Sequence, residues 1–184
     1  VGEVFKTYIV AQNGDAMCLI DKHAAHERIL YEQLLAAREN PAAQQLLAPV
    51  PVNLSGEEKN ALLQNTAALA AAGIDLDDFG GNAVMVRGIP ADVTPDNVED
   101  LIVELAGRLA VNNRDTMNEQ TEWVLHPVAC RAAVKAGDRT GPQQVLRLAQ
   151  DILAQKVPPF CPHGRPVVLE ITQKEIEKQF GRLG

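Results

Sequence analysis

The chain has 184 residues, 46% of them hydrophobic, which is enough to bury a substantial core in one domain or in two small ones. Its formal net charge of −7 argues against a free-standing nucleic-acid-binding protein, because DNA affinity comes largely from Lys and Arg; any DNA contact must be local or assisted by a partner. Three distant cysteines cannot form a closed disulfide set, and we find no leader or long apolar run, so we expect a reduced, cytoplasmic protein without a membrane segment.

The first part of the chain is predicted to form a hairpin and a helix. Residues 4–12 are rich in β-forming residues, and the turn signal Asn13-Gly14-Asp15 leads into a second strand over residues 16–20. Apolar residues then recur at helical spacing over residues 22–38. Asp21 is therefore expected at the junction between strand and helix.

The middle of the chain is predicted to alternate helices and strands. Ser55-Gly56-Glu57-Glu58 has the form of a capping box and starts a helix that runs up to Gly73. Two strands follow over residues 74–79 and 83–89, and Thr94-Pro95 starts another helix.

The last part of the chain is predicted to hold three helices and one strand. Pro127 favours the first turn of a short helix, and an amphipathic helix follows Gly141-Pro142. A strand over residues 167–171 leads into a last helix that Thr172-Gln173-Lys174-Glu175 caps. This alternation of hairpins and helices predicts an α+β fold, in which the middle stretch could be inserted between the terminal parts.

A first candidate site opens the helix predicted from residue 22. His23 and Glu27 are four positions apart and share one helix face, as paired helical metal ligands do, and Asp21 lies beside them. A carboxylate there could take a proton from water or hold a second cation. An exposed His–Glu pair, with Asp21 as the N-cap of the helix, explains the same residues without a metal.

A second candidate is the loop Cys-Pro-His-Gly-Arg-Pro at residues 161–166. Cys161 and His163 in this short, proline-stiffened loop would lose little entropy on binding a metal ion. A buried structural cysteine, or cysteine–histidine nucleophilic chemistry without an oxyanion motif, are the alternatives. Cys130 taken alone fits a core cysteine. Taken together, the three remote clusters suit Zn²⁺ or a similar divalent ion.

The peptide Gln-Gln-Leu-Leu-Ala-Pro at residues 44–49 is predicted to be extended. Its two leucines, Leu46 and Leu47, could enter a groove on another protein. The same hexapeptide also fits core leucines beside a turn, and both interpretations stay open at this point.

Five motifs follow one another along the chain: Asp21, His23, Ala24, Glu27 and Glu32 in one helical segment, then Gln44 to Pro49, Ala129-Cys130-Arg131, Cys161 to Pro166, and Phe180-Gly181-Arg182. In type, spacing and order they resemble the C-terminal dimerisation and endonuclease domain of the MutL mismatch-repair family, in the bacterial form that nicks DNA. The resemblance covers nearly the whole chain. Lys22 departs from it, because the family commonly has Gln there, and its charge could repel a metal ion or hold a phosphate.

The resemblance implies two α/β sandwich subdomains and a metal-dependent nuclease. Residues 1–43 and 140–184 would form a dimerisation subdomain, and residues 44–139 an external, regulatory subdomain. Zn²⁺ would be regulatory or structural, whereas Mn²⁺ or Mg²⁺ would support cleavage, since carboxylates favour harder ions. The implied metal ligands are His23, Glu27, Cys130, Cys161 and His163, and the implied catalytic residues are Asp21, His23 and Glu27.

The resemblance also implies partners. They are a second copy of the chain, DNA, the replication sliding clamp and other mismatch-repair proteins such as the mismatch sensor, in the bacterial cytoplasm at the nucleoid. A clamp would supply DNA at a high effective concentration and so compensate for the acidic charge. The implied clamp-binding residues are Gln44, Leu46, Leu47 and Pro49, and the candidates for phosphate contact are Arg131, Lys135, Arg139, Arg165 and Arg182. The alternative function is a noncatalytic, zinc-binding dimerisation and clamp-docking module.

Overall fold

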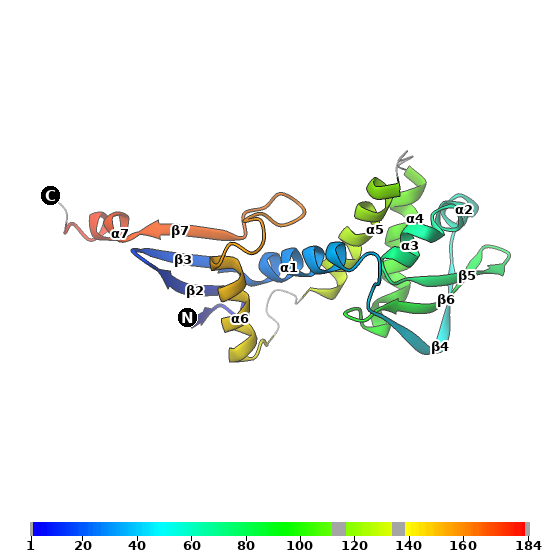
Figure 1. Cartoon of the computed structure of the whole chain (residues 1–184), viewed down its shortest axis with the longest axis horizontal. Coiled ribbons are helices and arrows are strands. Elements are labelled where there is room, and N and C mark those ends of the chain that lie inside the picture. Colours follow the sequence, from blue (N-terminus) through cyan, green and yellow to red (C-terminus); the bar gives the residue numbers. More distant parts are fainter. Residues whose placement is uncertain (1, 112–116, 134–138, 183–184) are drawn as a thin grey trace. The chain divides into compact units, whose positions relative to one another are not determined.

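The computed structural model describes residues 2–111, 117–133 and 139–182 (Figure 1). Its helices and two antiparallel sheets confirm the predicted α+β class. The chain forms two compact units: unit 1 comprises Val1–Leu30 and Ala133–Gly184, and unit 2 comprises Tyr31–Ala132. The boundaries suggested by the resemblance, 43/44 and 139/140, lie further along the chain. Among the described residues, no helix has the length and apolar composition that a membrane span needs.

Unit 1 is built on a four-stranded antiparallel sheet with the order β1-β2-β3-β7. The β2–β3 hairpin follows the prediction, because Gly14 supplies the positive φ of 60° that its tight turn requires. The capping box at Thr172 is also confirmed. The elements of unit 1 are β1 Gly2–Val4, β2 Tyr8–Asn13, β3 Ala16–Asp21, the first part of α1 Lys22–Ala36, α6 Pro142–Leu153, β7 Val168–Thr172 and α7 Gln173–Gln179.

The prediction of one strand over residues 4–12 is wrong. The backbone turns at Phe5 and Lys6, where φ is 55° and 54°, and β1 then pairs with β2 through Val4 and Tyr8. Neither turn position holds the Gly or Asn that normally marks a positive φ. The sequence pattern therefore gave no local signal for this hairpin.

The two faces of the unit 1 sheet have different surroundings. One face packs in a core of buried residues that includes Ile9, Ile20, Ala25, Val145, Leu148 and Ile152. On the other face, Val10, Leu19 and Leu169 are direct cross-strand neighbours. Val10 and Leu19 are half-buried, and Leu169 is 57% exposed. This second face, defined by Val10, Leu19 and Leu169, is called the open face below.

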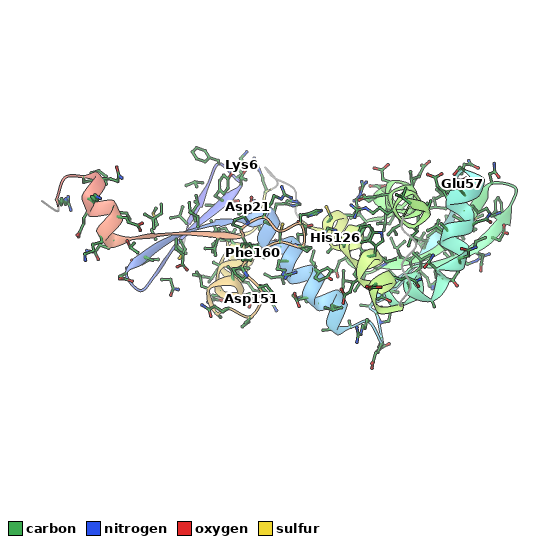
Figure 2. The ribbon with its side chains drawn as sticks, turned by 90° about the horizontal axis from the view of Figure 1, so that it is seen from above. Lys6, Asp21, Glu57, His126, Asp151 and Phe160 are labelled. Atoms are coloured by element: carbon green, nitrogen blue, oxygen red, sulfur yellow. The ribbon has the colours of Figure 1, made fainter. Side chains whose placement is uncertain are left out.

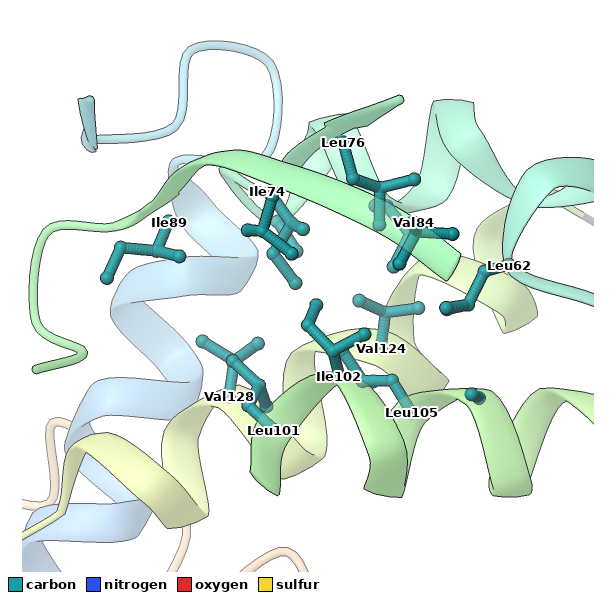
Figure 3. Close-up of a cluster of buried hydrophobic side chains, with 14 of the residues drawn as sticks. Leu62, Ile74, Leu76, Val84, Ile89, Leu101, Ile102, Leu105, Val124 and Val128 are labelled. Carbon is teal, nitrogen blue, oxygen red and sulfur yellow. The ribbon is translucent and has the colours of Figure 1, made fainter. Parts of the chain in front are cut away.

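Unit 2 is a three-stranded antiparallel sheet with the order β4-β6-β5, packed against helices. Figure 3 shows Ile102 and Leu105 of α4 and Val124 of α5 directed toward Val84 of β6, and all four side chains are fully buried. The elements of unit 2 are the end of α1, β4 Ala43–Asn53, α2 Gly56–Gln64, α3 Thr66–Ala71, β5 Asp75–Gly80, β6 Ala83–Pro90, the 3₁₀ turn η1 Pro95–Asn97, α4 Val98–Val111 and α5 Met117–Ala132.

Two helix predictions in unit 2 are wrong for identifiable reasons. Pro127 lies inside α5 instead of in a first turn. The stabilisation from burying Val124 and Val128 exceeds the cost of the backbone hydrogen bond that proline, which has no N–H, cannot donate. The helix predicted up to Gly73 divides into α2 and α3 at Asn65, whose Nδ2 donates to the Ala61 carbonyl oxygen at 2.8 Å. The capping box of α2 forms as predicted.

Candidate metal centre

Asp21 is the last residue of β3 and the N-cap of α1. Its Oδ1 accepts a hydrogen bond of 3.0 Å from the Ala24 N–H. Its own N–H donates to the Val167 carbonyl oxygen at 2.9 Å, next to β7. The start of α1 is therefore fixed against the segment that follows the loop at residues 161–166.

Glu27 is the centre of the cluster in unit 1. Its side chain is 0% exposed, its Oε1 lies 2.9 Å from His163 Nδ1, and its Oε2 lies 4.0 Å from His23 Nε2. Among the described residues, neither oxygen accepts a hydrogen bond of acceptable geometry, so the 2.9 Å approach is a contact between two possible ligand atoms. A buried carboxylate without hydrogen bonds is costly unless a positive charge compensates it. This donor set fits a divalent cation.

The loop at residues 161–166 is a closed turn that presents His163 to Glu27. The Cys161 N–H donates to the Arg165 carbonyl oxygen at 2.8 Å, and the Gly164 N–H donates to the Cys161 carbonyl oxygen at 2.8 Å. Gly164 has a φ of 82°, which a residue with a side chain rarely adopts. Cys161 is 2% exposed and packs in the core of unit 1, close to α1 and α6 residues of the same cluster.

Arg165 places a positive charge beside this cluster. A hydrogen bond to the Cys161 side chain, followed by the charge of Cys161, raises the pKa of the Arg165 guanidinium, and Glu27 and Asp21 add smaller electrostatic contributions. The guanidinium thus lies near the sulfur and within reach of the field of both carboxylates.

Lys22, the departure from the family pattern, is buried in unit 1. Its side chain is 0% exposed, and its Nζ lies 2.6 Å from Glu3 Oε1 on β1. A phosphate in solvent has no direct access to an ammonium group held in this way. Nothing in the sequence marks Glu3 as its partner, because the pair depends on the hairpin that the sequence pattern did not predict.

The remaining predicted residues lie elsewhere in the chain. Cys130 and Arg131 lie on α5 in unit 2, where Arg131 Nη2 is 2.9 Å from Glu104 Oε2 and Nη1 is 3.2 Å from Asp100 Oδ2. Arg131 would have to break its ion pairs with both carboxylates before its guanidinium could bind a phosphate. Arg182 is exposed after α7, Arg139 is also exposed, and Lys135 lies outside the described residues. Of the five predicted ligands, unit 1 holds His23, Glu27, Cys161 and His163.

The predicted docking peptide lies on β4 in unit 2. Gln44 Nε2 donates to the Val93 carbonyl oxygen at 2.8 Å, with longer contacts to the carbonyl oxygens of Pro90 and Ala91. The pairing of β4 with β6 shifts between Gln45 and Val50, and within this irregular stretch Leu47 is fully exposed. Leu46 packs partly on the unit 2 core. Gln44 therefore holds β4 against the segment at the end of β6 through its side-chain hydrogen bonds, and Leu47 is the side chain that is exposed to solvent.

Fold and site together define a class: an α+β domain of two units that carries a buried carboxylate–imidazole cluster suited to a divalent cation. Residues 1–140 match the family model described as the MutL C terminal dimerisation domain. The chain therefore belongs to the MutL C-terminal dimerisation domain family.

Curated relatives point to the same family. The chain is 34% identical over its full length to the DNA mismatch repair protein MutL of Caldanaerobacter subterraneus subsp. tengcongensis, where it covers 31% of the relative. It is 37% and 39% identical, over 99% of its length, to the proteins of that name from Methanothrix thermoacetophila and Methanoculleus marisnigri, of which it covers 33% and 32%. The chain thus spans about a third of the length of these relatives.

Proposed function

We propose that the chain is a metal-dependent DNA-nicking domain that works as a homodimer in DNA mismatch repair. The observation that carries the proposal is the buried Glu27 carboxylate, which has His163 at 2.9 Å, His23 at 4.0 Å and no hydrogen bond of acceptable geometry among the described residues. A structural carboxylate would normally be hydrogen-bonded or exposed. Nicking of supercoiled plasmid by the chain, with Mn²⁺ and loaded clamp, tests the proposal; an intact plasmid contradicts it.

His23, Glu27, Cys161 and His163 of unit 1 would hold the metal, and Cys130 on α5 stays a predicted ligand. Sulfur and imidazole suit Zn²⁺ in a regulatory or structural role, while carboxylates suit Mn²⁺ or Mg²⁺. A catalytic Mn²⁺ or Mg²⁺ ion would lower the pKa of a nearby water molecule and offset negative charge on the phosphate.

The side chains of unit 1 have distinct roles in the proposed hydrolysis. Asp21, held by the Ala24 N–H, accepts a proton as water attacks the phosphorus atom of the DNA backbone. The bond from phosphorus to one sugar oxygen breaks, and that oxygen takes a proton from solvent water to leave as a hydroxyl group. Arg165, beside Cys161, adds positive charge where the phosphate gains negative charge. Arg139 and Arg182, both exposed, are further candidates for a phosphate contact in unit 1.

The open face of the unit 1 sheet is the surface that we assign to the homodimer. Val10, Leu19 and Leu169 form an apolar row across three strands, and the family is a dimerisation family. Contiguous apolar surface of this kind is normally covered by a partner.

Leu169→Glu should therefore convert the dimer to monomer. A carboxylate placed in an apolar interface must lose its hydration without gaining a partner, so we expect the dimer dissociation constant to rise by at least about 100-fold. Sedimentation velocity measures the change. Val103→Glu, at a residue of α4 that is 43% exposed, is the matched control and should stay dimeric. A Leu169→Glu protein that still sediments as the parent dimer would exclude this face.

The clamp proposal assigns the contact to Leu47 and Pro49, with Leu46 and Gln44 supporting the strand. Leu47 is fully exposed in an irregular part of β4, which is how a short extended peptide offers a side chain to a groove. This contact is also the basis of the noncatalytic alternative, a zinc-stabilised dimerisation and clamp-docking module.

Leu47→Ala should weaken clamp binding by about fivefold or more, because truncation of a central apolar anchor typically costs upward of about 1 kcal/mol. Binding of immobilised clamp gives the measurement. Phe79→Ala removes another exposed apolar side chain of unit 2, 59% exposed, and should bind as the parent does. Equal clamp affinity for Leu47→Ala and Phe79→Ala would rule out this peptide as the docking site.

A further inference from the structure

The turn between β1 and β2 holds two side chains in a rare backbone conformation. Phe5 and Lys6 have φ of 55° and 54°, and such values disfavour residues other than Gly, Asn and Asp. Strain of this kind persists only where the surroundings fix it, and it concentrates at functional sites. The turn joins β1 to β2 with a positive φ at both central residues, as a type I′ hairpin turn requires. Phe5 and Lys6 therefore occupy positions that Asn or Gly would fit better, and we ask what these two side chains contribute.

The start of α1 fixes this turn at two points. The Lys22 N–H donates to the Thr7 carbonyl oxygen at 3.0 Å, and the buried Lys22 ammonium pairs with Glu3 at 2.6 Å. Thr7 also closes the turn itself, since its N–H donates to the Val4 carbonyl oxygen at 3.2 Å and its hydroxyl donates to the Phe5 carbonyl oxygen at 3.0 Å. The turn is thus attached to the residue that follows Asp21.

The turn offers an aromatic ring and a cation to solvent. Phe5 is 87% exposed, and Lys6 is also exposed. Tyr8, directly after the turn, is the cross-strand partner of Asp21, and Figure 2 shows Lys6 and Asp21 in the same part of unit 1. Proteins commonly contact DNA with lysines, which neutralise phosphates, and with aromatic rings, which pack against bases.

We propose that the Phe5–Lys6 turn is a DNA-contact element, in which Lys6 binds a backbone phosphate and Phe5 packs against a base step next to it. This inference rests on the proposed nuclease function and names the contact that brings DNA to the Asp21 end of the sheet. Lys6 also supplies local positive charge in a chain whose net charge is −7.

Lys6→Asn and Phe5→Asn test the contact without disturbing the turn, because Asn tolerates a positive φ better than either native residue. Affinity for a short fluorescent DNA duplex is measured by anisotropy over a series of KCl concentrations, without Mn²⁺ so that the DNA stays intact. Lys6→Asn should reduce the slope of log affinity against log salt by about 0.9, the value for one phosphate. Phe5→Asn should weaken binding by about fivefold or more and leave the slope unchanged.

Lys174→Ala on α7 and Phe79→Ala in unit 2 remove exposed side chains of the same types and should bind DNA as the parent chain does. The inference is overturned if both turn variants match these controls, or if the parent chain binds no duplex at low ionic strength. The proposed nuclease function is judged separately, by plasmid nicking. A turn-dependent DNA affinity without nicking would refute the nuclease proposal and leave the contact established.

Discussion

Asp21→Asn should abolish plasmid nicking while the fold and the metal content stay unchanged. Asn is as good an N-cap as Asp, so its side-chain oxygen keeps the hydrogen bond from the Ala24 N–H that starts α1. It cannot accept a proton from the attacking water, however. General acid–base residues contribute about 10²–10⁴-fold to rate, so we expect at least about a 100-fold loss of nicking in Mn²⁺ with loaded clamp.

Asp15→Asn is the matched control for this change. Asp15 is exposed and stands just before β3, whereas Asp21 ends the same strand, so the two variants differ in position and not in chemistry. Asp15→Asn should nick at the parent rate. Equal nicking by Asp21→Asn and the parent would show that Asp21 takes no part in the reaction. If neither protein nicks, the noncatalytic module becomes the better description of the chain.

The elements that the sequence predicts well are those with local causes. The β2–β3 hairpin follows from Asn13-Gly14-Asp15, and capping boxes mark the starts of α2 and α7. Pro127 inside α5 and the Phe5–Lys6 turn have causes outside their own segments: burial of the rest of α5 in one case, and the bonds that Lys22 makes in the other. Propensity cannot reveal either, because tertiary contacts override it.

The same distinction applies to the candidate site. The pairing of His23 with Glu27 is local, since residues four apart on a helix share a face. The approach of His163 to Glu27 is long-range and depends on β7 pairing with β3, which brings Val168 opposite Ile20. Spacing alone gives no such distance, and the sequence linked the two segments only through their compatible ligand types and the motif resemblance. The sequence also contained a signal for the open face. Apolar residues occur at both odd and even positions of β2 and β3, so both faces of these strands carry apolar side chains.

Position and protonation explain why a single cysteine of unit 1 is assigned to the metal. Burial, with a smaller contribution from the charge of Glu170, raises the pKa of the Cys18 thiol, which therefore stays protonated in the core. Cys161 is as deeply buried, but it belongs to the same closed turn as His163, whose Nδ1 lies 2.9 Å from Glu27 Oε1. Cys161 is therefore the cysteine of unit 1 that we expect to bind a metal ion.

Cys161→Ser and Glu27→Gln should each remove most of the Zn²⁺ from the purified chain. Loss even of a group that merely supports a ligand weakens metal binding by about 10–100-fold, so loss of a ligand should cost at least about 100-fold in affinity. Elemental analysis of the dialysed protein gives the metal content, and titration with a competing chelator gives the affinity. Because binding to the folded chain stabilises it, both variants should also lose the rise in Tm that Zn²⁺ gives the parent chain.

Cys18→Ala provides the control that separates metal binding from packing. It removes an equally buried sulfur in the core of the same unit, so it should lower the Tm without added metal and still gain the full increase on addition of Zn²⁺. Cys161→Ser should instead have a Tm that does not rise when Zn²⁺ is added. If Cys161→Ser and Glu27→Gln bind as much Zn²⁺ as Cys18→Ala does, the metal centre has to be given up.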